Sequence, residues 1–295
     1  MRVFVTGATG WVGSATVKDL IAAGHGVLGM ARSDEGAKAL KAAGAEAHRG
    51  TLEDLDSLRR GAAAAEGVIH CAFIHDFTRF AENGQVDKRA IEAMGEVLAG
   101  TGKPLIVTSG TAMLAPGGVA TEDTAPPGDY VSPRQSEPAA LAFLDRGVRA
   151  MVMRLPPSVH GAGDKGFVPT LIGVARAKGV SAYIGEGANR WTATHRLDAA
   201  RAYRLAIEKG TAGARYHPID EEGVAFRDIA AAIGAGLGVP VVSLTPEQAA
   251  EHFGFFAMFA GMDAAATGAK TRAALGWAPT QPGLLADIAA HYFEG

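Results

Sequence analysis

The sequence predicts an α/β protein with a doubly wound parallel sheet and a smaller C-terminal domain, and three observations indicate this fold class. Residues 1–5 form a short apolar run with β-branched side chains, which is typical of a buried strand. A glycine-rich turn follows, and then apolar residues at Val17, Leu20 and Ile21 show the spacing of a helix packed on one face. Apolar runs and helical segments continue to alternate, as parallel strands joined by helices require.

The turn after the first strand reads Thr6-Gly7-Ala8-Thr9-Gly10-Trp11-Val12-Gly13. Gly7 permits a tight turn, Gly10 lets backbone N–H groups approach a pyrophosphate, and Gly13 lets the helix lie close to the strand. The helix N-terminus adds N–H donors and partial positive charge. Strand, turn and helix form the context of a Rossmann-type dinucleotide fingerprint. We therefore expect cofactor contacts from Gly7, Thr9, Gly10, Trp11, Val12 and Gly13.

The spacing T-G-x-x-G-x-x-G near residue 6 resembles the extended and atypical short-chain dehydrogenase/reductases, a group that includes sugar-nucleotide epimerases and dehydratases. Further motifs extend the resemblance over nearly the whole chain. They are V-I-H-x-A at 68–72, R-P-x-x-x-Y-G near 154–161, H-V-x-D at 195–198 and K-x-R-x-L-G-W-x-P at 270–279.

The resemblance also implies a domain organisation. Residues 1–155 would form the Rossmann-type nucleotide domain, and residues 190–218 would return to it. Residues 156–295 would form mainly a substrate-binding domain.

Composition argues against several classes of function. The net charge is −3 and no basic cluster is present, which argues against nucleic-acid binding. Cys71 is the only cysteine, so an intrachain disulfide is impossible and we expect no metal site. No apolar run reaches the ~18 residues of a membrane span, and no signal-type region precedes the first strand. We therefore expect a cytoplasmic protein that binds a small molecule.

The end of the second strand, 26–31, points to the form of the cofactor. NAD sites carry an acidic residue there that binds the ribose 2′-hydroxyl. Here Arg32 and Ser33 follow, and they can pair with a 2′-phosphate, so NADP(H) is favoured. The alternative is a solvated arginine at the start of a loop. Asp34 and Glu35 are interpreted as N-terminal charges of the next helix, 34–43.

Two later turns complete the expected cofactor site. In the family a G-D-L-x-D turn lines the adenine, and the resemblance carries this role in part to Thr51 and Leu52, with Thr51 in place of the Asp. The family's V-I-H-x-A turn passes the nicotinamide ribose, and the resemblance therefore implies cofactor contacts from Cys71 and Ala72. We also expect a cofactor contact from Thr108, which ends the next strand. Cys71 itself is interpreted as a small buried hydrophobe, because nothing nearby would lower its pKa.

The fifth strand, 103–108, runs into Ser109-Gly110-Thr111, where the family places its catalytic Ser or Thr. Gly110 occupies the usual catalytic position. Ser109 and Thr111 flank it, so either is a candidate substitute, because a hydroxyl can both donate and accept a hydrogen bond. The alternative is that both hydroxyls only cap the end of the strand.

The family's Y-x-x-x-K motif, whose Tyr donates the proton, can be matched in two registers. One uses Tyr130 and Arg134. The other matches Ser136 to the family's Ser, which puts Pro133 at the Tyr and Glu137 at the Lys. We favour this second, degenerate register, because proline is tolerated only in the first turn of a helix and Pro138 therefore sets the helix start near 135–137.

If the Tyr is lost, other groups must manage the proton. Tyr130, His75 and His160 are the candidates. His75 follows the fourth strand, where ligands of open α/β sheets bind, and His160 stands where the family has a Tyr beside the substrate. Both could instead be structural: His75 a solvated loop residue and His160 a satisfied loop histidine. The aromatic run 253–259 could wall an apolar cleft or pack in the core.

The leading hypothesis is an NADP(H)-dependent oxidoreductase that reduces a small, largely apolar carbonyl or a related C=N or C=C substrate. One alternative is a sugar-nucleotide epimerase or dehydratase. Another is a non-catalytic NADP(H)-binding sensor. The resemblance also implies a homodimer formed through helices near 80–99 and 136–146.

Overall fold

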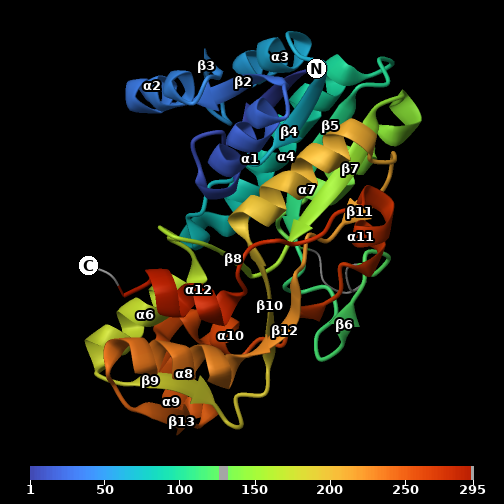
Figure 1. The fold of residues 1–295 in the computed structure, drawn as a ribbon. Coiled ribbons are helices and arrows are strands. Elements are labelled where there is room, and N and C mark those ends of the chain that lie inside the picture. The colour runs from blue at the N-terminus through green and yellow to red at the C-terminus, as the bar shows by residue number, and fades with distance from the viewer. Residues whose placement is uncertain (126–131, 294–295) are drawn as a thin grey trace.

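The computed structural model describes residues 1–125 and 132–293, and a seven-stranded parallel sheet forms its larger part (Figure 1). The strand order is β11-β7-β5-β4-β1-β2-β3, so the order reverses between β1 and β4. This is the doubly wound sheet that the sequence predicts. The strands are β1 (Arg2–Thr6), β2 (Gly26–Ala31), β3 (Glu46–Arg49), β4 (Gly67–His70), β5 (Pro104–Gly110), β7 (Arg149–Leu155) and β11 (Arg215–Tyr216).

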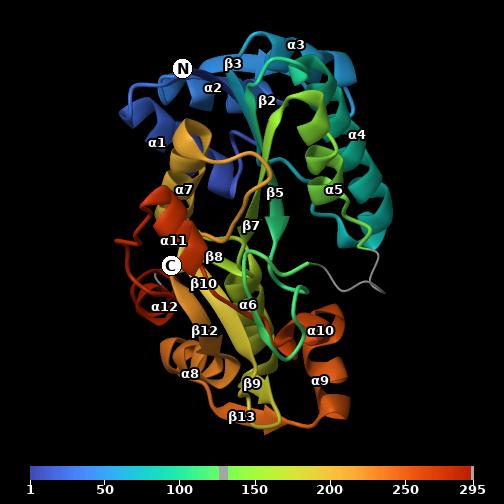
Figure 2. The ribbon, with the colours of Figure 1, turned by 90° about the vertical axis from the view of Figure 1, so that its right-hand side faces the viewer.

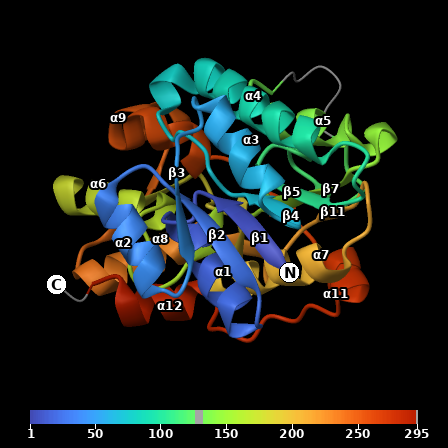
Figure 3. The same ribbon diagram turned by 90° about the horizontal axis from the view of Figure 1, so that it is seen from above.

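Helices cover both faces of this sheet (Figure 3). Val3 and Val5 of β1 face one core, whereas Phe4 between them faces the other, because side chains alternate along a strand. One face is packed by α1 (Trp11–Ala22), α2 (Asp34–Ala42) and α7 (Arg196–Lys209). The other is packed by α3 (Leu55–Ala63), α4 (Phe80–Leu98) and α5 (Ser136–Leu141). The sheet is therefore buried on both sides, which explains its continuous apolar strands.

The remaining elements form a smaller domain at the C-terminal ends of the main strands (Figure 2). Its strands are β8 (Ser158–His160), β10 (Arg190–His195) and β12 (Glu221–Ala225) in one sheet, β9 (Ser181–Ile184) with β13 (Val241–Leu244), and β6 (Val119–Ala120) with β14 (Ala265–Ala266). Its helices are α6 (Phe167–Lys178), α8 (Phe226–Leu237), α9 (Pro246–Phe253), α10 (Ala257–Ala260) and α12 (Leu284–His291). Helix α11 (Ala269–Leu275) instead packs against α7 and β11, and its Leu275 belongs to the core of the main sheet. Short 3-10 turns are η1 (Phe77–Arg79), η2 (Leu144–Arg146) and η3 (Gly254–Phe256).

The segment 190–218, which the sequence predicts to return to the nucleotide domain, is divided in the structure. The return begins at α7, because β10 pairs with β8 and β12 in the smaller sheet, whereas β11 joins the main sheet. Asp198 lies in the first turn of α7, where its buried carboxylate accepts hydrogen bonds from the Thr280 and Gln281 backbones, and His195 caps the helix.

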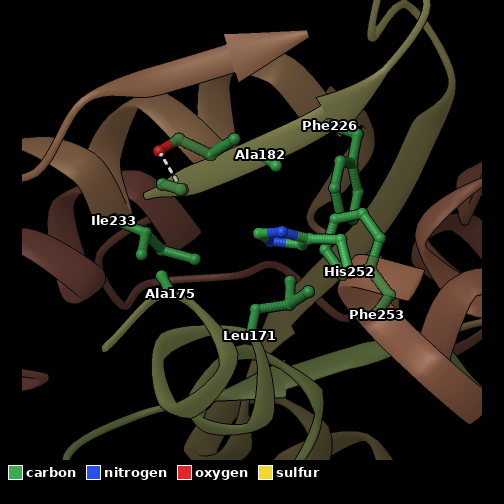
Figure 4. A pocket seen from close by; sticks show the side chains of 9 residues that line it. Leu171, Ala175, Ala182, Phe226, Ile233, His252 and Phe253 are labelled. Carbon is green, nitrogen blue, oxygen red and sulfur yellow. Dashed lines mark hydrogen bonds between the residues drawn. The ribbon is translucent and has the colours of Figure 1, made fainter. Parts of the chain in front are cut away.

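The core of the smaller domain encloses a cavity of about 10 Å³, and the imidazole of His252 points into it (Figure 4). This volume has room for about one water molecule. Apolar side chains such as Leu171 and Ile233 form most of its wall. The cavity is too small for a substrate. No helix among residues 1–125 and 132–293 is long and apolar enough to cross a membrane.

Candidate active site

The glycine-rich turn has the shape of a phosphate cradle. Gly7 has φ +64°, in the left-handed region, and a Cβ on it would lie 2.7 Å from the Ala72 nitrogen. A Cβ on Gly13 would lie 2.1 Å from the Gly7 oxygen. Gly10 is the N-cap of α1, so the first-turn N–H groups after it have no carbonyl one turn earlier. Because the turn ends at the switch point between β1 and β4, its residues fit a dinucleotide pyrophosphate.

The side chain of Trp11 serves a different purpose from its backbone. Its indole nitrogen donates to the Val159 carbonyl at 2.7 Å, and the Arg196 guanidinium stacks 4.1 Å from the ring centre. Trp11 therefore ties the glycine-rich turn to β8 and α7. Thr9 is exposed beside it, whereas Val12 packs partly against the core.

The structure adds a residue to the expected 2′-phosphate site. Arg32 is exposed at the end of β2, and the Ser33 hydroxyl caps α2 by accepting from the Gly36 N–H at 3.1 Å. Arg49 ends the neighbouring strand β3, paired with Ala31, so it lies beside this edge. The sequence reasoning missed Arg49, although the adjacency of β2 and β3 in a doubly wound sheet was the signal for it. Its guanidinium is 3.6 Å from the Asp34 carboxylate.

The turn expected to line the adenine, which begins at Thr51, is held by a hydrogen bond within the turn. The Thr51 hydroxyl accepts from the Asp54 N–H at 3.2 Å, and Leu52 is buried in the core beneath α3 and α4. Glu53 of the same turn lines a groove of about 550 Å³ that Ile74 and Val86 also border. This groove offers space for a base beside the turn.

A buried chain of polar groups lies at the ends of β1 and β4. The Thr6 hydroxyl is 2.8 Å from His70 Nδ1, and His70 Nε2 is 3.0 Å from Asp87. The Ser136 hydroxyl donates to the other Asp87 oxygen at 2.5 Å, and Arg134 Nε donates to Ser136 at 2.9 Å. The Thr6 hydroxyl also accepts from the Ala72 N–H at 3.3 Å, so this polar chain reaches the backbone of the turn after β4.

These hydrogen-bonded polar groups hold the guanidinium of Arg134 at the C-terminal ends of the strands. Arg134 also donates to the Thr108 carbonyl at 2.7 Å, and its guanidinium lies 4.2 Å from the centre of the Phe73 ring. Burial would raise the pKa of Asp87, but the hydrogen bond from His70 and the charge of Arg134 lower it. Asp87 is therefore an anion, and it fixes Ser136 and Arg134 in place.

Cys71 and Thr108, both expected near the cofactor, are part of a buried cluster. Thr108 donates to the His70 carbonyl at 2.8 Å and accepts from the Tyr203 hydroxyl at 2.6 Å. Burial raises the pKa of the Cys71 thiol to about 12. Cys71 is therefore not a nucleophile, as its sequence context indicates. The backbones of both Cys71 and Ala72 lie against the glycine-rich turn, because a Cβ on Gly7 would lie 2.8 Å from the Cys71 carbonyl carbon and 2.7 Å from the Ala72 nitrogen.

The two candidate hydroxyls lie at the end of β5: Ser109 is in the strand and Thr111 follows it. Ser109 is half-buried and hydrogen-bonds the Glu137 carboxylate, which helps to lower the Glu137 pKa. Thr111 is buried, and both its N–H and its hydroxyl face the Leu155 carbonyl, at 3.0 and 3.4 Å. Ser109 thus has the more accessible hydroxyl of the two.

Helix α5 begins at Ser136, within the predicted 135–137 range, so Pro138 lies in its first turn. Glu137, which the degenerate register puts at the family's Lys, forms a bidentate ion pair with the buried Arg154 at 2.8 Å. Burial would raise the Glu137 pKa, but Arg154 and Arg215 hold it low. Tyr130, the donor of the other register, lies outside the described residues.

The two candidate histidines have contrasting surroundings. His75 is exposed at the end of β4; desolvation by its neighbours and the charge of Arg134 lower its pKa. His160 is fully buried, and its Nδ1 donates to Asp287 at 2.8 Å. Its Nε2 has no hydrogen-bond partner in the described part of the chain. His160 therefore has no exposed surface, and its expected contact with a substrate stays a prediction.

A family model described as "NAD dependent epimerase/dehydratase family" matches residues 3–219. The chain is 50% identical over 291 residues to the protein C2A9.02 of Schizosaccharomyces pombe, covering 98% of this chain and 99% of that protein. It is 27% identical to 4-hydroxy-2-methyl-3-oxo-4-farnesyl-3,4-dihydroquinoline-1-oxide ketoreductase of Stigmatella aurantiaca, covering 86% and 80% of the two chains. The fold is also similar to that of DesIV, a dTDP-glucose 4,6-dehydratase of Streptomyces venezuelae solved with NAD and TYD bound. The TM-score is 0.79, with 18% identity and coverage of 99% and 96%.

Proposed function

The chain belongs to the NAD dependent epimerase/dehydratase family, and within it we propose an NADP(H)-dependent reductase of a small, largely apolar carbonyl or a related C=N or C=C substrate. The observation that carries this proposal is a contrast within one site. The phosphate cradle is complete, whereas the family's Lys position holds Glu137, neutralised by Arg154.

The contrast bears on the reaction because oxidation of a hydroxyl and reduction of a carbonyl need different catalytic groups. An epimerase or dehydratase begins by oxidising a sugar hydroxyl, which needs a base for the hydroxyl proton. In the degenerate register no Tyr-Lys pair supplies that base. Reduction of a carbonyl instead needs stabilisation of the negative charge that develops on oxygen. The guanidinium of Arg134 can provide it, because Nε and one Nη2 hydrogen are used and no hydrogen-bond partner among residues 1–125 and 132–293 takes its other N–H donors.

The bound cofactor would supply hydride to the substrate. The glycine-rich turn would hold its pyrophosphate, and Arg32, Ser33 and Arg49 would pair with its 2′-phosphate. Arg134 would orient the carbonyl oxygen and stabilise the alkoxide. The proton would come from His75, from Ser109 or from solvent. The reductase named among the relatives supports this direction of chemistry for an NAD(P)-dependent enzyme.

The test is a screen for NADPH oxidation across aldehydes, ketones, imines and enones, run in parallel with dTDP- and UDP-glucose. We expect turnover of an apolar carbonyl and none of the nucleotide sugars. Epimerised or dehydrated sugar would overturn the reductase in favour of the second enzyme class of this family. Tight NADPH binding without turnover of any compound would favour the sensor.

A further inference from the structure

Six rings form a continuous line of contacts between the two domains, here called the aromatic bridge: Phe73, His75, Phe77, Phe80, Phe255 and Phe259. The first four lie between β4 and the first turn of α4, and the last two lie in η3 and α10. Phe77 stacks on Phe80, with centroids 5.9 Å apart. The same ring lies 6.1 Å from Phe255 and 6.1 Å from Phe259. Phe77 therefore joins the nucleotide domain to the smaller domain.

The outer part of the bridge is exposed. Phe77 is 37% exposed, Phe255 66% and the nearby Met258 of α10 61%. The core of the smaller domain does not need these rings, because Phe253 and Phe256 of the same run are buried in it. Single exposed apolar residues are ordinary, but exposed rings that contact one another mark a binding surface.

The inner end of the bridge reaches the proposed reaction site. Phe73 lies beneath the Arg134 guanidinium at 4.2 Å and contacts Phe80 at 5.8 Å and His75 at 5.4 Å. Arg134 is held by Thr108 and Ser136 at the C-terminal ends of the strands. The bridge therefore starts at the cation that would receive the carbonyl oxygen, and it ends on the protein surface.

We propose that the aromatic bridge binds the tail of the substrate, so that the substrate is a carbonyl compound with an aryl group or an unbranched alkyl chain of several carbons. This inference rests on the proposed function and narrows its substrate class. Flat rings and alkyl chains gain edge-to-face or dispersion contacts along such a line of rings. A sugar nucleotide would bring a charged diphosphate to a surface that offers only apolar side chains at Phe77, Phe255 and Met258.

The first test is a chain-length series of 2-alkanones from C4 to C12 with NADPH. We expect kcat/KM to rise by up to about fourfold per methylene until the bridge is filled, mainly through KM. Phe77→Ala and Phe255→Ala should flatten the rise, so that their loss of kcat/KM relative to the wild type grows with chain length. Val241→Ala, which removes an exposed apolar side chain from β13, is the control and should retain the rise.

The second test measures binding without turnover. Saturation-transfer NMR of 2-decanone and 4-phenyl-2-butanone, with NADP⁺ present, should show signal at the tail protons that Phe77→Ala and Phe255→Ala both weaken. Tail binding of this kind without reduction of any carbonyl would overturn the proposed function but support the bridge. Reduction with no dependence on chain length, or equal tail signal in wild type and both variants, would overturn the bridge. Thermal denaturation of each variant identifies any that does not fold, and Phe77→Leu then replaces it.

Discussion

The glycine-rich turn and the start of α5 border the same edge of the main sheet, but they differ in what holds them. The turn is made of backbone: Gly7 adopts a left-handed φ and Gly13 leaves no side chain between helix and strand. The start of α5 is made of side chains from distant elements. Its neighbouring residues Ser136 and Glu137 enter two separate networks, one through Asp87 and one through Arg154.

This difference explains how the glycine-rich turn can match the family pattern while the start of α5 departs from it. A backbone cradle needs only small residues at fixed spacing, so it survives wide changes elsewhere. A side-chain site changes whenever one partner changes. A carboxylate at position 137 is stable because Arg154 is buried against it, and the favoured register puts this pair where the family has a lysine. The predictions below test the two regions, beginning with the largest expected effect.

Removing the carboxylate of α5 should destabilise the fold most. Glu137→Ala leaves the buried Arg154 without its partner, which should lower the free energy of unfolding by about 3–5 kcal/mol. The matched control is Glu96→Ala, which breaks an exposed bidentate pair with Arg146 and should cost much less, because solvent screens an exposed pair. Urea denaturation measures both. Equal losses would show that the α5 pair is no more important than a surface pair.

The cradle should lose ligand binding without losing the fold. A Cβ at Gly10 would lie 3.1 Å from the Gly7 oxygen, which small shifts can accommodate. Gly10→Val should therefore fold but bind NADPH at least about a hundredfold more weakly, because its side chain occupies the approach of the pyrophosphate. Gly13→Val should instead fail to fold, since its Cβ would lie 2.1 Å from the Gly7 oxygen. Normal NADPH titration of Gly10→Val would show that the turn does not hold phosphates.

The same contrast decides what could be predicted from sequence. The strands, most helix boundaries and the register of α5 follow from local patterns, because proline, glycine and apolar spacing act within a few residues. The polar chain from Thr6 to Arg134 and the pairing of Glu137 with Arg154 could not be foreseen. Apart from the near neighbours Arg134 and Ser136, the bonded partners lie 17 to 64 residues apart and meet only through the order of strands in the sheet. The burial of His160 had the same cause, since Asp287 is contributed by the final helix.

Substitutions at the end of β2 should change the preference for NADPH over NADH, and this effect should be smaller than the two before it. We expect NADPH to bind at least tenfold more tightly than NADH, about 1.4 kcal/mol, because Arg32 and Ser33 end β2 where an acidic residue would favour NAD. Arg32→Ala should lower the preference for NADPH over NADH. Arg49→Ala should lower this preference less, because Arg49 is already paired with the Asp34 carboxylate. Lys38→Ala, an exposed cation later in α2, is the control. Fluorescence titration with both cofactors measures the ratios, and equal affinities in the wild type would refute the argument.

The smallest effect should come from the residue that a conventional alignment would choose first. With α5 starting at Ser136, the favoured register puts the family's Tyr position at Pro133 and leaves Tyr130 without a catalytic role. Tyr130→Phe should therefore lower kcat by less than about tenfold, whereas loss of a true general acid costs about 10²–10⁴-fold. NADPH affinity serves as the control and should not change.

If Tyr130 does not donate the proton to the alkoxide, another group does, and the pH dependence of the rate identifies it. Desolvation and Arg134 lower the pKa of His75, so this histidine is neutral at pH 7 and gains its proton only below the ordinary histidine pKa of about 6.5. A rate that rises as pH falls through that range, and is flattened by His75→Gln, would assign the proton to His75. A flat profile in both proteins would assign it to Ser109 or to solvent. A hundredfold loss in Tyr130→Phe would instead restore Tyr130 and Arg134 as the working pair, because only a group that protonates the alkoxide itself can cost so much.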